Sequence, residues 1–178
     1  MLPSGARVVF RKPEPADLES LYEQKNDYEV KNLLGGFSRP LSHADLAEWL
    51  ERHRRLSDEV LWAIVSQDSG KCLGHMGLYK IDTVARSAEF GIMIGDQSAW
   101  GCGIGRVATA FALHHAFRRE NLNRVSLTVL ATNDRAIRLY LKMGFVEEGK
   151  LRQAQFKEGK YVDVVAMGIL ESEFNDVP

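Results

Sequence analysis

A glycine-rich run at residues 101–105 is the stretch whose residue types and spacing point most directly to chemistry. Three glycines alternate there with two other residues, and an apolar pattern of helical period begins directly after them. Glycines at a helix start let the backbone approach a ligand, and the first N–H groups lack partners within the helix. With the positive end of the helix dipole, these donors predict a phosphate site. The run consists of Gly101, Cys102, Gly103, Ile104 and Gly105.

Three classes of phosphate-binding loop could explain these glycines. A P-loop requires Gly-x-x-x-x-Gly-Lys-Ser/Thr, and the sequence contains no such string. A Rossmann dinucleotide site is closer, because residues 103–108 fit G-x-G-x-x-A. However, residues 95–102 separate this motif from the preceding strand, and the acidic residue expected about twenty positions later is missing. A coenzyme A loop is the third class, and the glycines alone are a weak signal.

Four ordered motifs resemble the GNAT superfamily of acetyltransferases, especially its ribosomal-protein N-terminal (Rim-type) and polyamine branches. Residues 100–105 are similar to the family's pyrophosphate loop, with Trp100 in place of its first polar residue. Residues 87–94 resemble its splayed central strand, and residues 133–145 its second conserved block. Residues 148–163 resemble its C-terminal pattern. The resemblance covers roughly residues 7–170, and four motifs in order are a strong signal.

This resemblance implies an N-acetyltransferase that moves the acetyl group of acetyl-CoA directly to a primary amine in a ternary complex. The backbone of residues 92–94 would pair with the pantetheine arm, and the N–H groups of residues 101–106 would hold the pyrophosphate. Asn133 would bond the pantetheine or the acetyl end, and Tyr140 would protonate the departing thiolate. The implied cofactor-binding residues are Ile92, Met93, Ile94, Gly101, Cys102, Gly103, Ile104, Gly105, Arg106 and Asn133.

Acyl transfer to an amine needs a neutral amine and a proton for the leaving thiolate. Tyr140 is the candidate acid, since a phenol with a pKa of about 10 can protonate a thiolate; the alternative is an aromatic residue packed on an amphipathic helix. Glu89 is the candidate base, directly or through water; the alternative is a solvated or paired glutamate. Some relatives carry a glutamate at the place of Thr128, which cannot act as a base, so His75 is a second candidate.

Cysteine and metal chemistry receive little support from the sequence. Only Cys72 and Cys102 are present, too few for a disulfide scaffold or a cysteine-based metal site. Cys102 stands at a helix start, where a nucleophilic thiol is conceivable, but no His or carboxylate lies near it in sequence. We therefore expect Cys102 to be a loop residue and expect no metal.

The composition is that of a globular protein and excludes several classes of function. The chain has 178 residues, of which 45% are hydrophobic and 26% charged, and its net charge is −1. A balanced charge gives no electrostatic basis for nucleic-acid binding. No segment has the composition of a membrane span or an N-terminal targeting sequence. We therefore expect one domain over residues 1–178, in the cytoplasm, with neither a nucleic-acid nor a membrane partner.

Periodicity and turn composition predict the elements that must position these residues. They describe one mixed α/β sheet flanked by helices. The resemblance adds a GNAT-like arrangement: a mostly antiparallel sheet of about seven strands and about four helices, with a splayed central strand pair. The expected strands are 7–11, 60–66, 72–80, 87–95, 124–130, 145–152 and 161–170. The expected helices are 15–25 and those that begin near 42, 103 and 133, and residues 32–40 are expected to form a loop.

Three classes of function stay open at this point. An N-acetyltransferase is the leading one, and a non-catalytic acyl-CoA-binding sensor is the second. Tyr140 argues against the sensor, and the absence of a glutamate at position 128 argues weakly for it. A Rossmann NAD(P)-binding protein is the third. The acceptor amine is undefined among a protein N-terminus, a polyamine, an amino sugar, an antibiotic and other small amines, and the resemblance is compatible with a homodimer.

Overall fold

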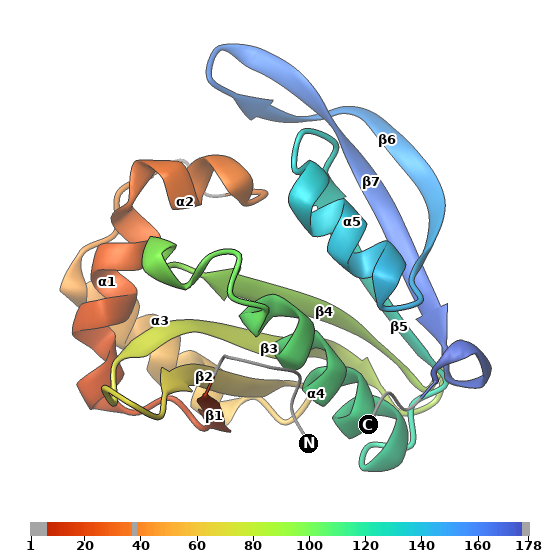
Figure 1. Cartoon of the computed structure of the whole chain (residues 1–178), viewed down its shortest axis with the longest axis horizontal. Coiled ribbons are helices and arrows are strands. Elements are labelled where there is room, and N and C mark those ends of the chain that lie inside the picture. The colour runs from red at the N-terminus through yellow and green to blue at the C-terminus, as the bar shows by residue number, and fades with distance from the viewer. Residues whose placement is uncertain (1–6, 37–38, 176–178) are drawn as a thin grey trace.

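The computed structural model describes residues 7–36 and 39–175 and contains one seven-stranded sheet (Figure 1). The strand order is β1-β2-β3-β4-β5-β7-β6, and every neighbouring pair is antiparallel except β4–β5. The mixed α/β fold with a mostly antiparallel sheet is therefore confirmed. The strands are β1 (Val8–Arg11), β2 (Val60–Ser66), β3 (Cys72–Asp82), β4 (Ser87–Ile94), β5 (Arg124–Leu130), β6 (Val146–Lys157) and β7 (Lys160–Leu170).

The parallel pair β4–β5 is joined along only part of its length. Its register contains three residue pairs, of which Glu89 with Ser126 is the last. Beyond Glu89, β4 continues to pair with β3 but no longer with β5. The splayed central pair is therefore confirmed, and one edge of residues 90–94 has no strand beside it.

In the described part of the chain, five α-helices cover the two faces of the sheet. Leu21 of α1 and Leu46 of α3 pack on one face in a small core, and α4 and α5 pack on the other in the larger core. Figure 1 shows α4 in front of the sheet. None of the helices in the described ranges is long and apolar enough to cross a membrane. The helices are α1 (Leu18–Asn26), α2 (Tyr28–Leu33), α3 (His43–Arg55), α4 (Ile104–Arg118) and α5 (Asp134–Lys142).

Strand β3 runs two residues beyond its expected end, to Asp82, and two other boundaries differ more from the sequence-based expectation. The first residues of the expected loop 32–40 belong to α2, and residues 37–38 of that loop lie outside the described residues. The helix α2 begins because the Asp27 side chain accepts a hydrogen bond from Val30 N, but Val30 is its only buried residue, so it has no apolar stripe. Strand β6 runs to Lys157 rather than to residue 152. Its residues are almost all exposed, so no alternation of apolar and polar residues indicated where the strand ends.

Candidate functional site

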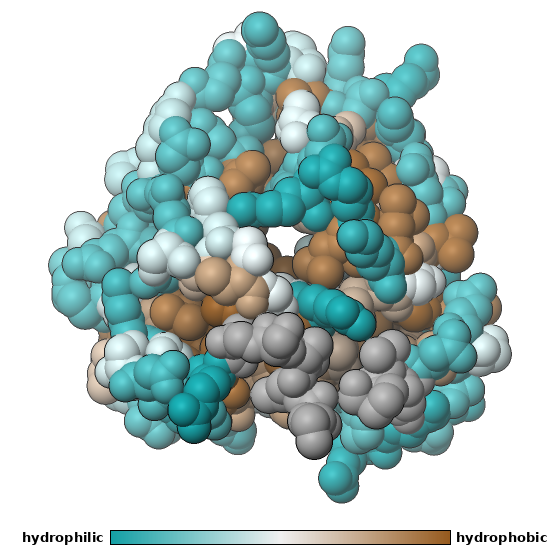
Figure 2. All heavy atoms as spheres, in the orientation of Figure 1, coloured by the Kyte–Doolittle hydropathy of each residue, from teal (hydrophilic) through white to brown (hydrophobic). Residues whose placement is uncertain are grey.

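The separation of β4 from β5 opens a cavity of about 1200 Å³. Strands β3, β4 and β5 contribute residues to its wall. Residues of α1, α2 and α3 line it on one face of the sheet, and the glycine loop with α5 lines it on the other. Figure 2 shows the surface hollowed at the centre of this view. The cavity therefore brings together residues of both faces.

The glycine loop forms an open cradle at the start of α4. Gly101 and Gly103 have φ angles of +79° and +81°, and Gly103 is the N-cap of α4. A Cβ atom at either position would have no atom outside its chain neighbours within 4 Å, so a ligand has room to approach this backbone. Gly105 differs, because a Cβ there would lie 3.1 Å from Cδ2 of Leu139. Its small size serves the packing of α4 against α5.

Basic side chains gather beside this cradle. Arg106 is exposed and lines the cavity directly after the loop. The guanidinium carbon of Arg135 lies 4.4 Å from the ring centroid of Trp100, and Arg138 and Lys142 of α5 also line the cavity. The three α5 residues were missed in the sequence analysis. Their spacing of three and four residues was a usable signal, but it acquires meaning only when α5 lies beside the loop.

Two groups near the glycine loop, the Cys102 thiol and the Ile94 carbonyl, already contact other atoms of the protein. Cys102 is exposed, and its Sγ lies 3.8 Å from the carbonyl oxygens of Ser98 and Trp100. No His or carboxylate of the described chain bonds to it, as expected for a loop residue. Residues 92–94 line the cavity, but Trp100 Nε1 donates a hydrogen bond of 2.8 Å to the Ile94 carbonyl. The Ile94 carbonyl is therefore less available to a ligand than the backbone groups of Ile92 and Met93.

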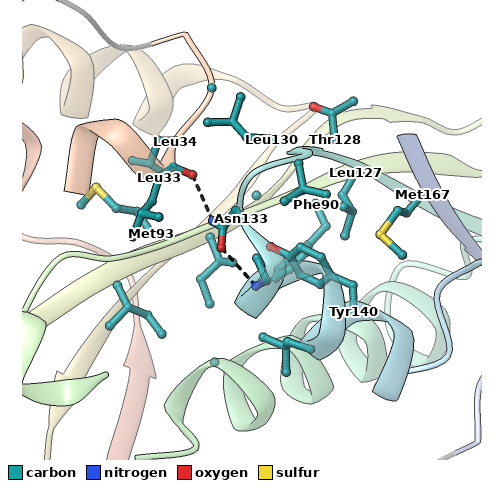
Figure 3. Close-up of a pocket in the computed structure, with 18 of the residues that line it drawn as sticks. Leu33, Leu34, Phe90, Met93, Leu127, Thr128, Leu130, Asn133, Tyr140 and Met167 are labelled. Atoms are coloured by element: carbon teal, nitrogen blue, oxygen red, sulfur yellow. Dashed lines mark hydrogen bonds between the residues drawn. The ribbon is translucent and has the colours of Figure 1, made fainter. Parts of the chain in front are cut away.

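Asn133 uses both atoms of its carboxamide within the protein (Figure 3). Its Oδ1 accepts a hydrogen bond of 3.1 Å from Ala136 N and so caps α5. Its Nδ2 donates a hydrogen bond of 3.1 Å to the Leu33 carbonyl at the end of α2. Asn133 therefore links the two helices across the cavity, and a ligand would have to compete for its amide.

Tyr140 lies on α5 and combines packing with access to the cavity. Its ring meets Phe90 at a centroid distance of 6.5 Å and Phe145 at 5.7 Å, and only 7% of the residue is exposed. Figure 3 shows its hydroxyl directed toward Asn133, and no described residue hydrogen-bonds to it. Burial raises the pKa of Tyr140 to about 12, so the phenol keeps its proton at neutral pH.

Glu89 lies where β4 and β5 part, on the opposite face from Tyr140. Strand alternation directs Phe90 into the larger core with Tyr140, whereas Met93 belongs to the core beneath α1 and α3. Glu89 shares the Met93 face, is exposed, and forms an ion pair of 2.9 Å with Lys80. The candidate acid and base therefore face the cavity from opposite sides of the sheet.

A family profile described as an acetyltransferase (GNAT) domain matches residues 7–146 of the chain. The chain belongs to the GNAT acetyltransferase family.

Relatives of this GNAT chain match nearly its whole length. The spermidine N(1)-acetyltransferase of Vibrio cholerae serotype O1 is 32% identical over 171 residues, which cover 96% of each protein. A ribosomal N-acetyltransferase-like protein of Bacillus subtilis is 29% identical, with 94% of this chain and 93% of its own covered. A crystal structure of spermidine N-acetyltransferase from Vibrio cholerae in complex with CoA and spermine has a TM-score of 0.86 and 31% identity. It matches 94% of this chain and 97% of that one. The predicted branch of the family is confirmed.

The second candidate base of this GNAT protein is buried. Only 8% of His75 is exposed, and neither ring nitrogen has a hydrogen-bond partner among the described residues. Burial lowers the pKa of His75 well below its usual value, and the charges of Lys25 and His53 lower it further. The imidazole is therefore neutral at pH 7 and a weak proton acceptor. Thr128 is exposed at the cavity wall, where its hydroxyl supplies no base.

Several residues at the α1 and α3 end of the cavity were missed in the sequence analysis. Lys25 is 4% exposed, and burial lowers its pKa to about 8. The side chains of His53 and Glu59 form a close pair beside Tyr79. These residues come from α1, α3, the position before β2 and the interior of β3, so only the tertiary fold brings them together. The missed residues are Lys25, Trp49, His53, Glu59 and Tyr79.

Proposed function

We propose that the chain transfers the acetyl group of acetyl-CoA directly to a primary amine, with both substrates bound in the cavity between β4 and β5. The observation that carries this proposal is the separation of these strands beside an open glycine cradle. The proposal treats residues 1–178 as one transferase domain, since β1 to β7 join one sheet. A cytoplasmic location agrees with a reaction on a cofactor of central metabolism, and no metal enters the proposal.

The cofactor binds from the α4 and α5 face. Backbone N–H groups of residues 101–105 hold the pyrophosphate, because the start of α4 offers donors and a positive dipole. The N–H of Arg106, which the sequence included in this set, donates instead to the Gly103 carbonyl at 3.1 Å. Arg106 and Arg135 add positive charge beside this loop. The free edge of β4 at Ile92 and Met93 faces the pantetheine arm, since β5 has turned away from it there.

Tyr140 donates the proton that the leaving sulfur needs. Burial raises the pKa of Tyr140 to about 12, which makes it a weaker acid than an exposed phenol. A thiolate that forms in the same cavity is also poorly hydrated, which raises its basicity and favours its protonation by the phenol.

Glu89 accepts the proton of the attacking amine, directly or through water. It lies at the fork of β4 and β5, so an amine that enters from the α1 and α3 face passes it before reaching the opposite face. The acceptor is a primary amine of the kinds that the sequence left open. Spermidine is the first to test, because a relative that is 32% identical over 96% of each protein is named for it.

A thiol-release assay with acetyl-CoA and a panel of amines tests this proposal. The panel contains peptide N-termini, spermidine and aminoglycosides, and mass spectrometry identifies the acetylated product. We expect thiol release that depends on the amine and on Tyr140. Acetyl-CoA binding without release from any amine would instead indicate a sensor. Binding of a nicotinamide cofactor in place of acetyl-CoA would indicate the Rossmann alternative.

A further inference from the structure

One end of the cavity is built around Trp49. The ammonium nitrogen of Lys25 lies 4.3 Å from the Trp49 ring centroid. The rings of His53 and His75 lie 4.7 Å and 5.1 Å from it. We call these four residues the Trp49 cluster. All four line the cavity on the face of the sheet opposite the glycine cradle, so they lie on the acceptor side of the proposed reaction.

The carboxylates that line the cavity are already matched with basic side chains. Among the described residues these carboxylates are Glu59, Glu89 and Glu148. Glu59 contacts Nδ1 of His53, Glu89 lies 2.9 Å from Lys80, and Glu148 accepts hydrogen bonds from the Arg124 guanidinium. A second ammonium of an acceptor would therefore have to compete with a basic side chain of the protein itself for any of these carboxylates.

The aromatic surface at this end is also occupied by a cation. A polyamine ammonium could use the face of Trp49 through a cation–π contact, which is the usual role of tryptophan toward cations. Lys25 lies over that ring, and it is almost completely buried. Its positive charge repels a second cation at short range, and the burial of Lys25 makes this repulsion stronger than it would be in bulk water. The Trp49 cluster thus disfavours a multiply charged amine.

The same cluster offers donors to an anion. His75 is nine-tenths buried and lines the cavity, and neither of its nitrogens has a partner among the described residues. A neutral imidazole carries one N–H donor, and a buried donor without a partner is costly. A carboxylate oxygen would satisfy that donor and would also attract the ammonium of Lys25.

We propose that the Trp49 cluster binds a carboxylate of the acceptor, so that the acceptor is an amino acid rather than a polyamine. This inference rests on the proposed acetyl transfer and defines its substrate class. In the reaction, the amine nitrogen forms a bond to the acetyl carbon and the bond from that carbon to sulfur breaks. The amine loses one proton to the base, and the sulfur gains one from the acid. The products are an N-acetylated amino acid and free CoA.

Matched pairs of amines test the inference on the unmodified protein. Ornithine and putrescine differ only in the carboxylate, as do lysine and cadaverine, and spermidine completes the set. We expect kcat/KM for each amino acid to exceed that of its diamine by at least about tenfold. Equal values, or a preference for the diamines or spermidine, would overturn the inference and leave the proposed acetyl transfer intact.

The variant Lys25→Met links the preference to the cluster. Methionine keeps most of the side-chain length and removes the charge. We expect it to raise KM for ornithine by about tenfold and to leave KM for putrescine unchanged or lower. A thermal melt verifies that the variant folds. If the folded variant keeps the wild-type ratio of ornithine to putrescine, the assignment of Lys25 is wrong.

A binding measurement separates this inference from the proposed function. Calorimetric titrations of ornithine and of putrescine into the wild-type protein, each with CoA present, need no turnover. Binding of ornithine alone supports the inference even if no amine releases thiol, in which case only the proposed catalysis fails. Binding of putrescine alone, or of neither compound at millimolar concentration, overturns it.

Discussion

The Tyr140 side chain combines a packed aromatic ring with a hydroxyl group at the cavity. Its ring packs against Phe90 and Phe145, and its hydroxyl reaches the cavity without a described hydrogen-bond partner. Tyr140→Phe keeps the ring and removes the proton, so it separates the two roles. We expect turnover to fall by at least about a hundredfold, since general acid catalysis contributes about 10²–10⁴-fold. Steady-state kinetics and thermal melts with and without acetyl-CoA measure the effect.

The stability and the acetyl-CoA affinity of Tyr140→Phe are expected to stay close to wild type, because the hydroxyl acts when the thiolate departs. Turnover within a few fold of wild type would make Tyr140 a core aromatic residue and water the proton source. Because burial raises the pKa of Tyr140 to about 12, the acid is fully protonated below about pH 11. No loss of rate from its ionisation is therefore expected between pH 6 and pH 10.

A second prediction at the residue scale concerns Glu89, the proposed base. Because a base removes the proton of the amine before the thiolate leaves, its loss should change the pH dependence of the rate. Glu89→Gln should lower turnover and remove the fall in rate that protonation of a base causes at acid pH, while acetyl-CoA binding survives. A pH–rate profile of the variant measures this. Glu147→Gln is the matched control, since Glu147 is exposed on β6 and does not line the cavity. A profile unchanged by Glu89→Gln would mean that the amine arrives neutral or that another residue accepts its proton.

At the scale of elements, the start of α4 allows a comparison between two glycines of similar conformation. Gly103 has φ +81° in the cradle, and Gly70 has φ +71° in the turn between β2 and β3. Neither would bring a Cβ within 4 Å of another residue, so valine at either site costs a similar backbone strain of about 1–2 kcal/mol. Only Gly103→Val blocks the proposed pyrophosphate site. We expect its acetyl-CoA dissociation constant to rise at least about tenfold by calorimetry, with that of Gly70→Val unchanged.

Asn133 joins α5 to α2 through two hydrogen bonds, and two substitutions separate the contributions of these bonds to stability. Asn133→Asp keeps an oxygen to cap α5 at Ala136 N and loses the donor to the Leu33 carbonyl. Asn133→Ala loses both. Because an N-cap contributes about 1 kcal/mol, the alanine variant should be less stable than the aspartate variant by about that amount in denaturant titrations. Equal stabilities would show that the cap contributes little here.

The sequence predicted elements whose signals are local and missed those that depend on packing. The helices expected to begin near residues 42 and 133 do so, because Ser42 and Asp45 form a capping box at the start of α3 and Asn133 caps α5. Such caps use residues three apart in the sequence. The helix α2 was missed, because a six-residue helix has too few positions to show a period. The same limit applies to the site. The glycine cradle is contiguous, whereas Lys25 and His75 meet only after α1 folds over β3.

At the scale of the molecule, the cavity offers each of the two proposed substrates a different face of the sheet. The cradle and α5 carry basic side chains on one face, and the Trp49 cluster lies on the other. The two meet where β4 leaves β5, between Glu89 and Phe90. An attacking amine and a thioester that enter from opposite faces of a sheet meet without sharing a path. Such an arrangement suits direct transfer in a ternary complex.

Hydrogen bonds join the α2 segment to the hairpin of β6 and β7 beside the cavity, which Gly36 and Gln155 line. Gly36 N donates a hydrogen bond of 3.1 Å to Gln155 Oε1, and Lys157 Nζ donates one of 3.0 Å to the Lys31 carbonyl. The Tyr28 hydroxyl also contacts the Glu158 carboxylate. Since a helix of six residues is unstable by itself, these contacts should hold α2 in place.

Removing two of these contacts should therefore loosen α2 without affecting the sheet. Each hydrogen bond contributes about 0.5–1.5 kcal/mol, so Gln155→Ala combined with Lys157→Ala should raise amide hydrogen exchange in α2 at least about fivefold. Exchange in β2 and β3 should stay at the wild-type rate. Arg152→Ala is the control, because Arg152 lies on the same hairpin and has no hydrogen bond to the α2 segment. If exchange in α2 is unchanged, the buried Val30 side chain holds the helix, and the hairpin contributes little to its stability.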